Sequence, residues 1–442
     1  MKSSHSLSRL EVAFDDHRLI AAAGLLLPAT LGKQLGLEEL FDEHVALGIP
    51  NAGANVGRKA LTLIASALAG GDCIDDADAL RAGGTEEVLG HRVAAPSTLG
   101  TFLRSFTWGH SLQVEKVLGQ ALRRAWAAGA GPGDRPLTID LDSTICETYG
   151  LQKQGGWGFT YNHVRGYHPL LAVAAGSGDV CHARLRRGSA IAAQGAGKFV
   201  TETIRRVRQA GASGRITLRG DSGFYNHEVV GACERAGVRY SISARMFKPL
   251  HAAIEAIPDS DWVPIPYFLD GAEVAETTYT PFAYRHGKRQ PVRLVVRRVR
   301  PTPGSQLDLF GVPFSYHAFV TDRDETMLEV EADHRRHAEV ENTIRDLKYG
   351  VGLNHLPSGK FAANAVWLTL NALAHNLARW VSRIGLGEAL ITTKRLRFRH
   401  LNIPGRLTYS GRRWRLHLPE YWPWAEDFVL ALGRLRAIPL LS

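Results

Sequence analysis

The stretch LTIDLDST at residues 137–144 alternates apolar and polar side chains, which is the pattern of a half-buried β-strand. Asp140 and Asp142 are two positions apart in it, so their side chains point to the same face. Beside Ile139 and Leu141, two carboxylates on one face are costly unless that face is open to water or to a cation. We therefore expect the polar face of this strand to be open to water or to hold a cation.

Further strands and helices follow in an order that is typical of α/β proteins. The sequence predicts strands at 168–175 and 180–188, a helix at 196–211, a strand at 215–221, a helix at 227–237 and a strand at 238–245. This order describes an antiparallel meander followed by crossover units.

The rest of the chain divides around this α/β region by its pattern. The N-terminal part reads as mostly helical and ends in a glycine-rich break at 129–134. After the core, alternating runs with little helical periodicity predict a β insertion, and helices then return at 329–349 and 362–384. The predicted domains are 1–130 (helical), 131–245 (first part of the core), 246–325 (β-strand insertion), 326–385 (completion of the core) and 386–442 (basic C-terminal region).

Composition excludes several classes of protein. Among 442 residues, 45% are hydrophobic and 22% are charged, as in ordinary globular proteins. No apolar run reaches the roughly 18 residues of a membrane span, and the first ten residues lack the apolar part of a secretory signal. The four cysteines form no CxxC pair, and no GxxxxGK[ST], HExxH or GxSxG motif occurs. We expect a bacterial-type cytoplasmic protein with no membrane partner and no disulfide scaffold.

Basic charge is concentrated in two stretches of the chain. The formal net charge is +10, and the segment 285–300, which includes Arg285, Lys288 and Arg289, holds seven basic residues and no acid. The segment 394–415 holds eight basic residues and no acid. Localised positive charge suits a nucleic-acid backbone, whereas solvated basic strands are the alternative interpretation.

Two later acids could act together with the first strand. Asp221 ends an apolar strand, at the edge where open α/β sheets bind ligands. Glu341 lies on a predicted helix and shares a face with Arg345 and Lys348. Taken singly, Asp221 reads as a turn residue and Glu341 as part of a charged surface helix. Together with Asp142 they supply the three carboxylates that a two-metal phosphoryl-transfer site needs, because Mg²⁺ takes oxygen ligands.

The motifs TIDLDST, RGDSGFYN and ENTIRDLKYGVGLNHLPS together resemble the DDE transposases of bacterial insertion sequences. The resemblance is to the insertion-sequence family labelled thirteen-eighty, which is related to the group labelled four, and it extends over almost the whole chain. It implies an α/β fold with an RNase H-like catalytic core, an inserted β-rich region and a helical N-terminal domain. It also implies DNA cleavage and strand transfer that depend on two Mg²⁺ ions, for which Mn²⁺ can substitute.

The resemblance assigns catalysis and metal binding to Asp142, Asp221 and Glu341. Asp140 is then a neighbour on the same face, beside the metal site. In the related group a Tyr and an Arg precede the third acid and a Lys follows it. Lys348 matches that Lys, but His334 and His337 occupy the other two positions. An imidazole can donate to a phosphate, although it is a weaker anion partner than Arg.

The expected partner is double-stranded DNA, both the terminal inverted repeats of the element and the target, held by a homodimer. The residues expected to contact DNA are Lys348, Arg345, His334, His337, Arg285, Lys288, Arg289, Arg412 and Arg413. The tip at 285–289 and the tail at 394–415 should hold phosphates near the active site. Removing the three basic residues of the tip should lower the salt dependence of binding by up to about three units.

Two other functions remain open on the sequence alone. An RNase H-like nuclease or resolvase would use the same three acids but would hydrolyse DNA without joining it. A non-catalytic DNA-binding relic of a transposase would need none of them, and the presence of all three acids counts against that interpretation.

Overall fold

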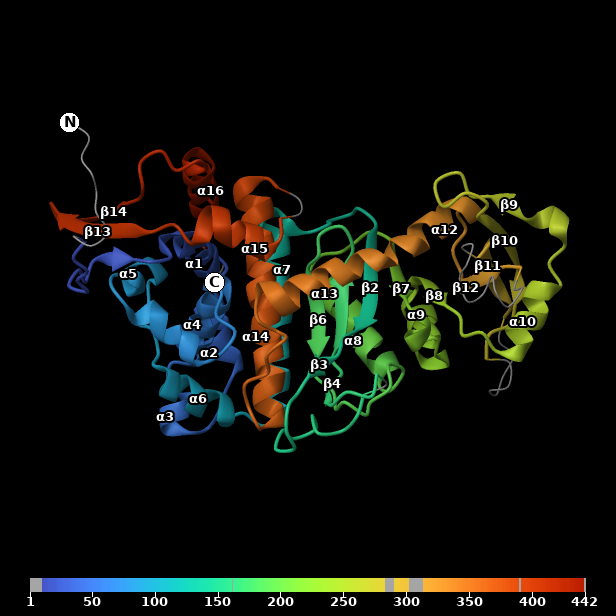
Figure 1. Cartoon of the computed structure of the whole chain (residues 1–442), viewed down its shortest axis with the longest axis horizontal. Helices are drawn as coiled ribbons and strands as arrows, with labels where there is room; N and C mark the ends of the chain where they lie inside the picture. Colours follow the sequence, from blue (N-terminus) through green and yellow to red (C-terminus); the bar gives the residue numbers. More distant parts are fainter. Residues whose placement is uncertain (1–9, 161, 283–289, 302–312, 389–390, 441–442) are drawn as a thin grey trace.

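A nine-stranded mixed sheet forms the centre of the molecule (Figure 1). The computed structural model describes residues 10–160, 162–282, 290–301, 313–388 and 391–440. In sheet order the strands are β6 (Val180–Arg184), β5 (Leu170–Ala174), β2 (Leu137–Ser143), β7 (Ile216–Gly220), β8 (Arg239–Ser243), β12 (Ser315–Thr321), β11 (Val292–Val299), β10 (Glu273–Tyr279) and β9 (Val263–Pro264).

The first five strands in this order form the predicted α/β core. β2 pairs antiparallel with β5, and β5 pairs antiparallel with β6, which is the expected meander. β2, β7 and β8 then run parallel. The helix α8 (Ala196–Gln209) leads from β6 to β7, and α9 (His227–Ala236) leads from β7 to β8. The fold prediction is therefore confirmed: a mixed α/β chain with a large mixed sheet and a helical N-terminal region.

The β insertion is continuous with the core sheet, because β12 pairs antiparallel with β8. The prediction of little helix in this region is wrong at one place, the helix α10 (Lys248–Glu255). α10 begins with a proline in its first turn and buries Leu250 and Ile254, which are four positions apart. A helix of two turns shows its periodicity only once, so the pattern was too short to detect.

The stretch predicted as one helix at 329–349 is two helices. α12 (Met327–Arg335) begins with a capping box between Thr326 and Glu329, and the 3₁₀ turn η7 (Arg336–Glu339) separates it from α13 (Val340–Gly350). Together they pass across the sheet from the insertion to α14 (Phe361–Trp380) (Figure 1). α14 is buried on nearly all sides, packing on the N-terminal helices and on β6.

The two ends of the chain pack together. β13 (Gly405–Ser410) pairs with both β1 (Leu19–Ile20) and β14 (Arg413–His417), and α16 (Ala425–Arg436) contacts α1 (Leu26–Gln34). The remaining elements are α2 (Leu37–His44), α3 (Pro50–Gly53), α4 (Val56–Ala69), α5 (Thr85–Leu89), α6 (Pro96–Arg104), α7 (Trp108–Ala125), α15 (Thr393–Leu396), and the short pair β3 (Cys146–Glu147) and β4 (Gly166–Tyr167).

All four cysteines are free thiols in the structure. Among the described residues, no helix combines the length and the apolar character that crossing a membrane requires.

A buried ion cluster joins the helical region to the core. Glu115 on α7 accepts hydrogen bonds from Arg184 on β6 (Nη2–Oε2 2.6 Å) and from Arg206 on α8 (Nη2–Oε2 3.3 Å). His182 lies 3.2 Å from the same carboxylate. Although burial opposes ionisation, the hydrogen bonds from His182 and Arg184 lower the pKa of Glu115 to about 2.

Replacing Glu115 by Gln is expected to lower the free energy of unfolding by about 3–5 kcal/mol, because the buried arginines lose their central carboxylate. Since the pKa of Glu115 is lowered, its contribution to stability is complete above its ordinary pKa of 4.5 and is lost as pH falls toward about 2. Urea denaturation at neutral pH measures the loss, with exposed Glu87→Gln as the matched control. A loss no larger than that of the control would contradict this role.

Candidate active site

Two of the three acids predicted from the sequence lie at the ends of neighbouring parallel strands. The last two residue pairs between β2 and β7 are Asp140 with Arg219 and Leu141 with Gly220. Asp142 and Asp221 are therefore the next residues along the two strands. The carboxylate of Asp142 accepts a hydrogen bond from the backbone N–H of Ser143 (2.6 Å). That of Asp221 accepts one from the N–H of Gly223 (2.9 Å), so Asp221 also caps the turn that follows β7.

Glu341, the third acid, lies exposed in the first turn of α13. The pKa of Asp142, the first acid, is raised to about 6. Burial is the main cause, and the negative charges of Asp221 and Glu341 raise this pKa further. His337 and the N–H of Ser143 act in the opposite direction. The structure thus brings the three carboxylates into one electrostatic neighbourhood, although they are 79 and 120 positions apart in the chain.

Asp140 has its own partners inside the protein. Both of its carboxylate oxygens accept hydrogen bonds from Arg219 (2.7 and 2.8 Å), and Nδ1 of His337 lies 2.9 Å from one of them. The residue is only 1% exposed. Asp140 is therefore a neighbour of Asp142 on the same face, as predicted, and its oxygens are already occupied by protein donors.

His334 is not available to DNA in this structure, and this part of the predicted DNA contacts is corrected. Its ring is buried, lies within hydrogen-bond distance of the hydroxyls of Ser241 (2.7 Å) and Ser243 (3.0 Å), and stacks on Phe319 at 4.0 Å. Burial lowers the pKa of His334 well below its usual value, which keeps the ring neutral. A neutral, enclosed imidazole packs the helix against the sheet and does not reach a phosphate.

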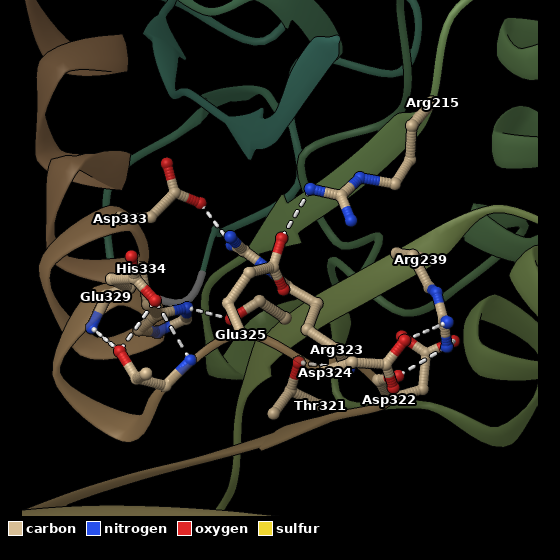
Figure 2. A network of polar contacts seen from close by, with 12 residues as sticks. Arg215, Arg239, Thr321, Asp322, Arg323, Asp324, Glu325, Glu329, Asp333 and His334 are labelled. Carbon is tan, nitrogen blue, oxygen red and sulfur yellow. Dashed lines mark hydrogen bonds and ion pairs between the residues drawn. The ribbon is translucent and has the colours of Figure 1, made fainter.

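The polar network around the start of α12 fixes this helix to the starts of β7 and β8, at the opposite ends of these strands from the acids (Figure 2). Arg215 bonds to Glu325, and Arg239 bonds to Asp324, so the segment between β12 and α12 is tied to residues at the start of β7 and β8. Arg323 pairs with Asp333 on the helix itself. These contacts determine where the chain enters the helical stretch that carries Glu341.

Arg345 and Lys348 lie on the same helix as Glu341. Arg345 is exposed and four positions beyond it, while Lys348 is half-buried in the last turn. The Lys348 charge acts on the thiol of Cys146 in β3, whose pKa burial raises to about 12. Both cations therefore remain on the side of the molecule where α13 passes β3.

In the part of the basic stretch 285–300 that the structure describes, residues 290–300, three arginines pair with acids of the protein and do not form the free cationic surface that the sequence suggested. Arg285, Lys288 and Arg289 lie outside the described residues. The arginines of β11 pair with acids of the protein, and these pairs are Arg293 with Glu276, Arg297 with Glu331, and Arg298 with Glu273 and Asp259. Because these acids come from other segments of the chain, a count of charges within the stretch 285–300 does not include them.

Arg412 and Arg413 are exposed at the turn between β13 and β14. This hairpin projects from the end of the molecule formed by the helical N-terminal region, whereas β2 and β7 lie in the middle (Figure 1). The expectation that the tail lies near the active site is therefore wrong for this hairpin, because pairing with β1 holds it against the helical region. The start of the tail, α15, packs against α13, where Thr393 bonds to Asp346.

Sequence reasoning missed two side chains beside the acids. Arg219 and His168 are each 1% exposed, and both lie close to the ends of the strands that carry the acids. Nδ1 of His168 donates to the carbonyl of Ala190 (2.7 Å), so Nε2 accepts from the hydroxyl of Ser143 (2.9 Å). In the sequence, each of the two appears only as a polar residue next to an apolar strand, and a polar residue of the core gives the same pattern.

A family model described as Transposase DDE domain group 1 matches residues 2–440. The chain belongs to this family. The transposase part of the resemblance is thereby confirmed. Among solved structures, the cryo-EM structure of the piggyBac transposase synaptic complex with hairpin DNA is similar, with a TM-score of 0.48 and 10% identity, covering 86% of this chain and 79% of that chain. Comparison with curated protein sequences finds no match.

Proposed function

We propose that this member of the transposase DDE family cleaves DNA at the ends of its own element and joins those ends to target DNA. Asp142, Asp221 and Glu341 are the catalytic carboxylates in this proposal. The observation that carries it is the convergence of two strand-end aspartates and a helical glutamate: β2 and β7 pair in parallel up to the residues before Asp142 and Asp221, and the charges of Asp221 and Glu341 both act on Asp142. We further propose a bacterial insertion sequence of the family labelled thirteen-eighty as the source, and a cytoplasmic, nucleoid-associated location.

The donor set fits divalent cations of the Mg²⁺ type. It consists of carboxylate oxygens. Burial raises the pKa of Asp142, with a smaller contribution from the charges of Asp221 and Glu341, and a bound cation would oppose both effects. Two trios of His, Cys, Asp or Glu with ligand atoms within 4.8 Å of one another occur among the described residues, and this set is neither of them.

Asp142, Asp221 and Glu341 would hold the two Mg²⁺ ions, which Mn²⁺ can replace. Bound there, such ions supply charge stabilisation for the attacking and leaving oxygens of an in-line displacement at phosphorus. The protein's own part is to present the carboxylates together and to hold the DNA strand against them. Arg345 and Lys348 would contact its phosphates, since both lie on the helix of Glu341 and carry charge complementary to DNA.

The DNA path in this proposal extends to the β13–β14 hairpin. Arg412 and Arg413 are exposed there beside the aromatic pair Tyr409 and Trp414, whose rings lie 4.9 Å apart. The hairpin adjoins the helical N-terminal region, so it would grip duplex flanking the cleavage site, with a homodimer holding both ends. The tip at 285–289 remains part of the proposal as first predicted.

Replacing Arg412 and Arg413 by Gln is expected to weaken binding to all DNA sequences alike. Each lost phosphate contact removes about 0.9 from the slope of log affinity against log salt, so the pair should lower it by about 1.8. Fluorescence anisotropy over a salt series measures this, with exposed Arg235→Gln and Lys248→Gln as the matched double control. An unchanged slope would mean that the hairpin carries only solvated charge.

One assay separates the proposed function from its alternatives. The full chain is incubated with Mg²⁺, a duplex bearing the element's end and a target plasmid, and products are resolved by gel. Joined products support the transposase, cleavage without joining supports a nuclease or resolvase, and binding without cleavage supports a non-catalytic relic. Terminal inverted repeats with a short target duplication around the gene identify the end sequence to use and independently favour the transposase.

A further inference from the structure

One buried guanidinium joins β2 and β7, the strands that lead to Asp142 and Asp221, to α12, the helix that precedes α13. Arg219 on β7 donates from Nε and Nη2 to the two oxygens of Asp140 on β2 (2.7 and 2.8 Å). Its Nη1 donates to the carboxylate of Asp333 on α12 (3.1 Å) and to the main-chain carbonyl of the same residue. Asp333 is in turn held by Arg323 (Figure 2). We refer to Arg219 with Asp140 and Asp333 as the bridge, and each of these three residues is paired with an opposite charge.

The bridge sets the register of the two aspartates. Asp140 and Arg219 are direct partners in the parallel ladder, and each lies two positions before an acid, Asp142 or Asp221. Residues two apart in a strand share a face, so the ion pair and the two acids succeed one another on one face of the sheet. A slip by one residue would turn one aspartate to the opposite face and break the pair.

His337 connects the bridge to the third acid. Its Nδ1 lies 2.9 Å from an oxygen of Asp140, and since a carboxylate only accepts, Nδ1 is the donor. Asp333, His337 and Glu341 are spaced four positions apart, about one helical turn each. The helical stretch is thus attached to β2 and β7 at the two turns that precede Glu341.

We propose that Asp140, Arg219 and His337 are positioning residues that hold Asp142, Asp221 and Glu341 in the relative arrangement that the metal ions require. This inference rests on the proposed function. It gives His337 a different part from the phosphate contact expected of it from the sequence: the imidazole acts through Asp140 and not on the DNA.

A matched pair of amide variants tests the contact from Nδ1. In H337N the amide nitrogen can occupy the place of Nδ1 and donate to Asp140, whereas H337Q carries its amide one bond further, at the place of Nε2. We expect H337Q to bind Mn²⁺ about 10- to 100-fold more weakly and to cleave correspondingly more slowly, because partners of metal ligands have effects of this size. H337N should stay close to wild type.

Mn²⁺ binding is measured on the full chain by the loss of the free-ion EPR signal, beside DNA affinity, cleavage rate and thermal unfolding. Exposed His251→Gln on α10 is the control substitution. Equal Mn²⁺ affinity in both His337 variants and wild type would overturn the inference, as would a fall in stability or in DNA affinity with Mn²⁺ binding unchanged. Equal impairment of both variants would also overturn it, since only one lacks the donor.

D142N in the same experiment separates this inference from the proposed function. If D142N binds Mn²⁺ as tightly as wild type, the assignment of the metal site itself fails, and the positioning role fails with it. If D142N loses Mn²⁺ while H337Q retains it, the proposed function stands and the positioning role alone is rejected.

Discussion

Neutralising any one of the three acids, as D142N, D221N or E341Q, is expected to reduce DNA strand cleavage by about 10³-fold or more while specific DNA binding persists. Metal-assisted charge stabilisation is worth several kcal/mol, and each 1.36 kcal/mol is a factor of ten in rate. The basic side chains that would hold DNA are untouched by these changes. Cleavage of a labelled element-end duplex and its binding by gel shift measure the two effects separately.

Asp270→Asn and Glu255→Gln serve as controls, because both residues are exposed and lie in the insertion. They should cleave at the wild-type rate. Normal cleavage by E341Q in Mg²⁺ would show that the third acid is assigned to the wrong residue. Asp140→Asn is expected to have a smaller effect than Asp142→Asn, because the oxygens of Asp140 bond to Arg219 and His337.

Activity is expected to be absent in EDTA, restored by Mg²⁺ or Mn²⁺, and not restored by Ca²⁺. Ca²⁺ binds carboxylates at longer distances and with looser geometry, so it occupies such sites without aligning an in-line attack. Cleavage rates measured across a titration of each ion, after exhaustive chelation, test this directly.

Ca²⁺ should still support the bound complex, which separates loss of chemistry from loss of binding. Anisotropy with the same duplex in Ca²⁺ provides that control. Full cleavage in EDTA would refute the two-metal mechanism, whichever residues bind the metal ions.

The two histidines before Glu341 show where residue-level prediction reached its limit. From sequence, His334 and His337 were equivalent, each at a position where a phosphate-binding side chain was expected. In the structure His334 is buried between two serines and Phe319, and His337 reaches Asp140. The 3₁₀ turn η7 lies between the buried ring of His334 and Glu341, and no local pattern in the sequence indicated it.

The basic residues of β11 show the same limit for charge. A run of cations without acids indicated a free surface, but the neutralising acids come from β10, from the segment before β9 and from α12. The arginines Arg412 and Arg413 of the β13–β14 hairpin are exposed, as the sequence suggested, but the hairpin lies at the helical end of the molecule and not at the strand ends.

The sequence by itself determined the order of strands and helices in the core, and it indicated that Asp142 and Asp221 lie at the ends of two of its strands. It could do so because period-2 alternation in LTIDLDST, glycine breaks and helical spacing are local properties, written within ten or so residues. The tertiary structure alone decided which charged groups meet: Asp140 with Arg219, β1 with β13, and Glu115 with Arg184. Such pairs join residues far apart in the chain, and a periodic pattern reports which face is buried but not which partner covers it.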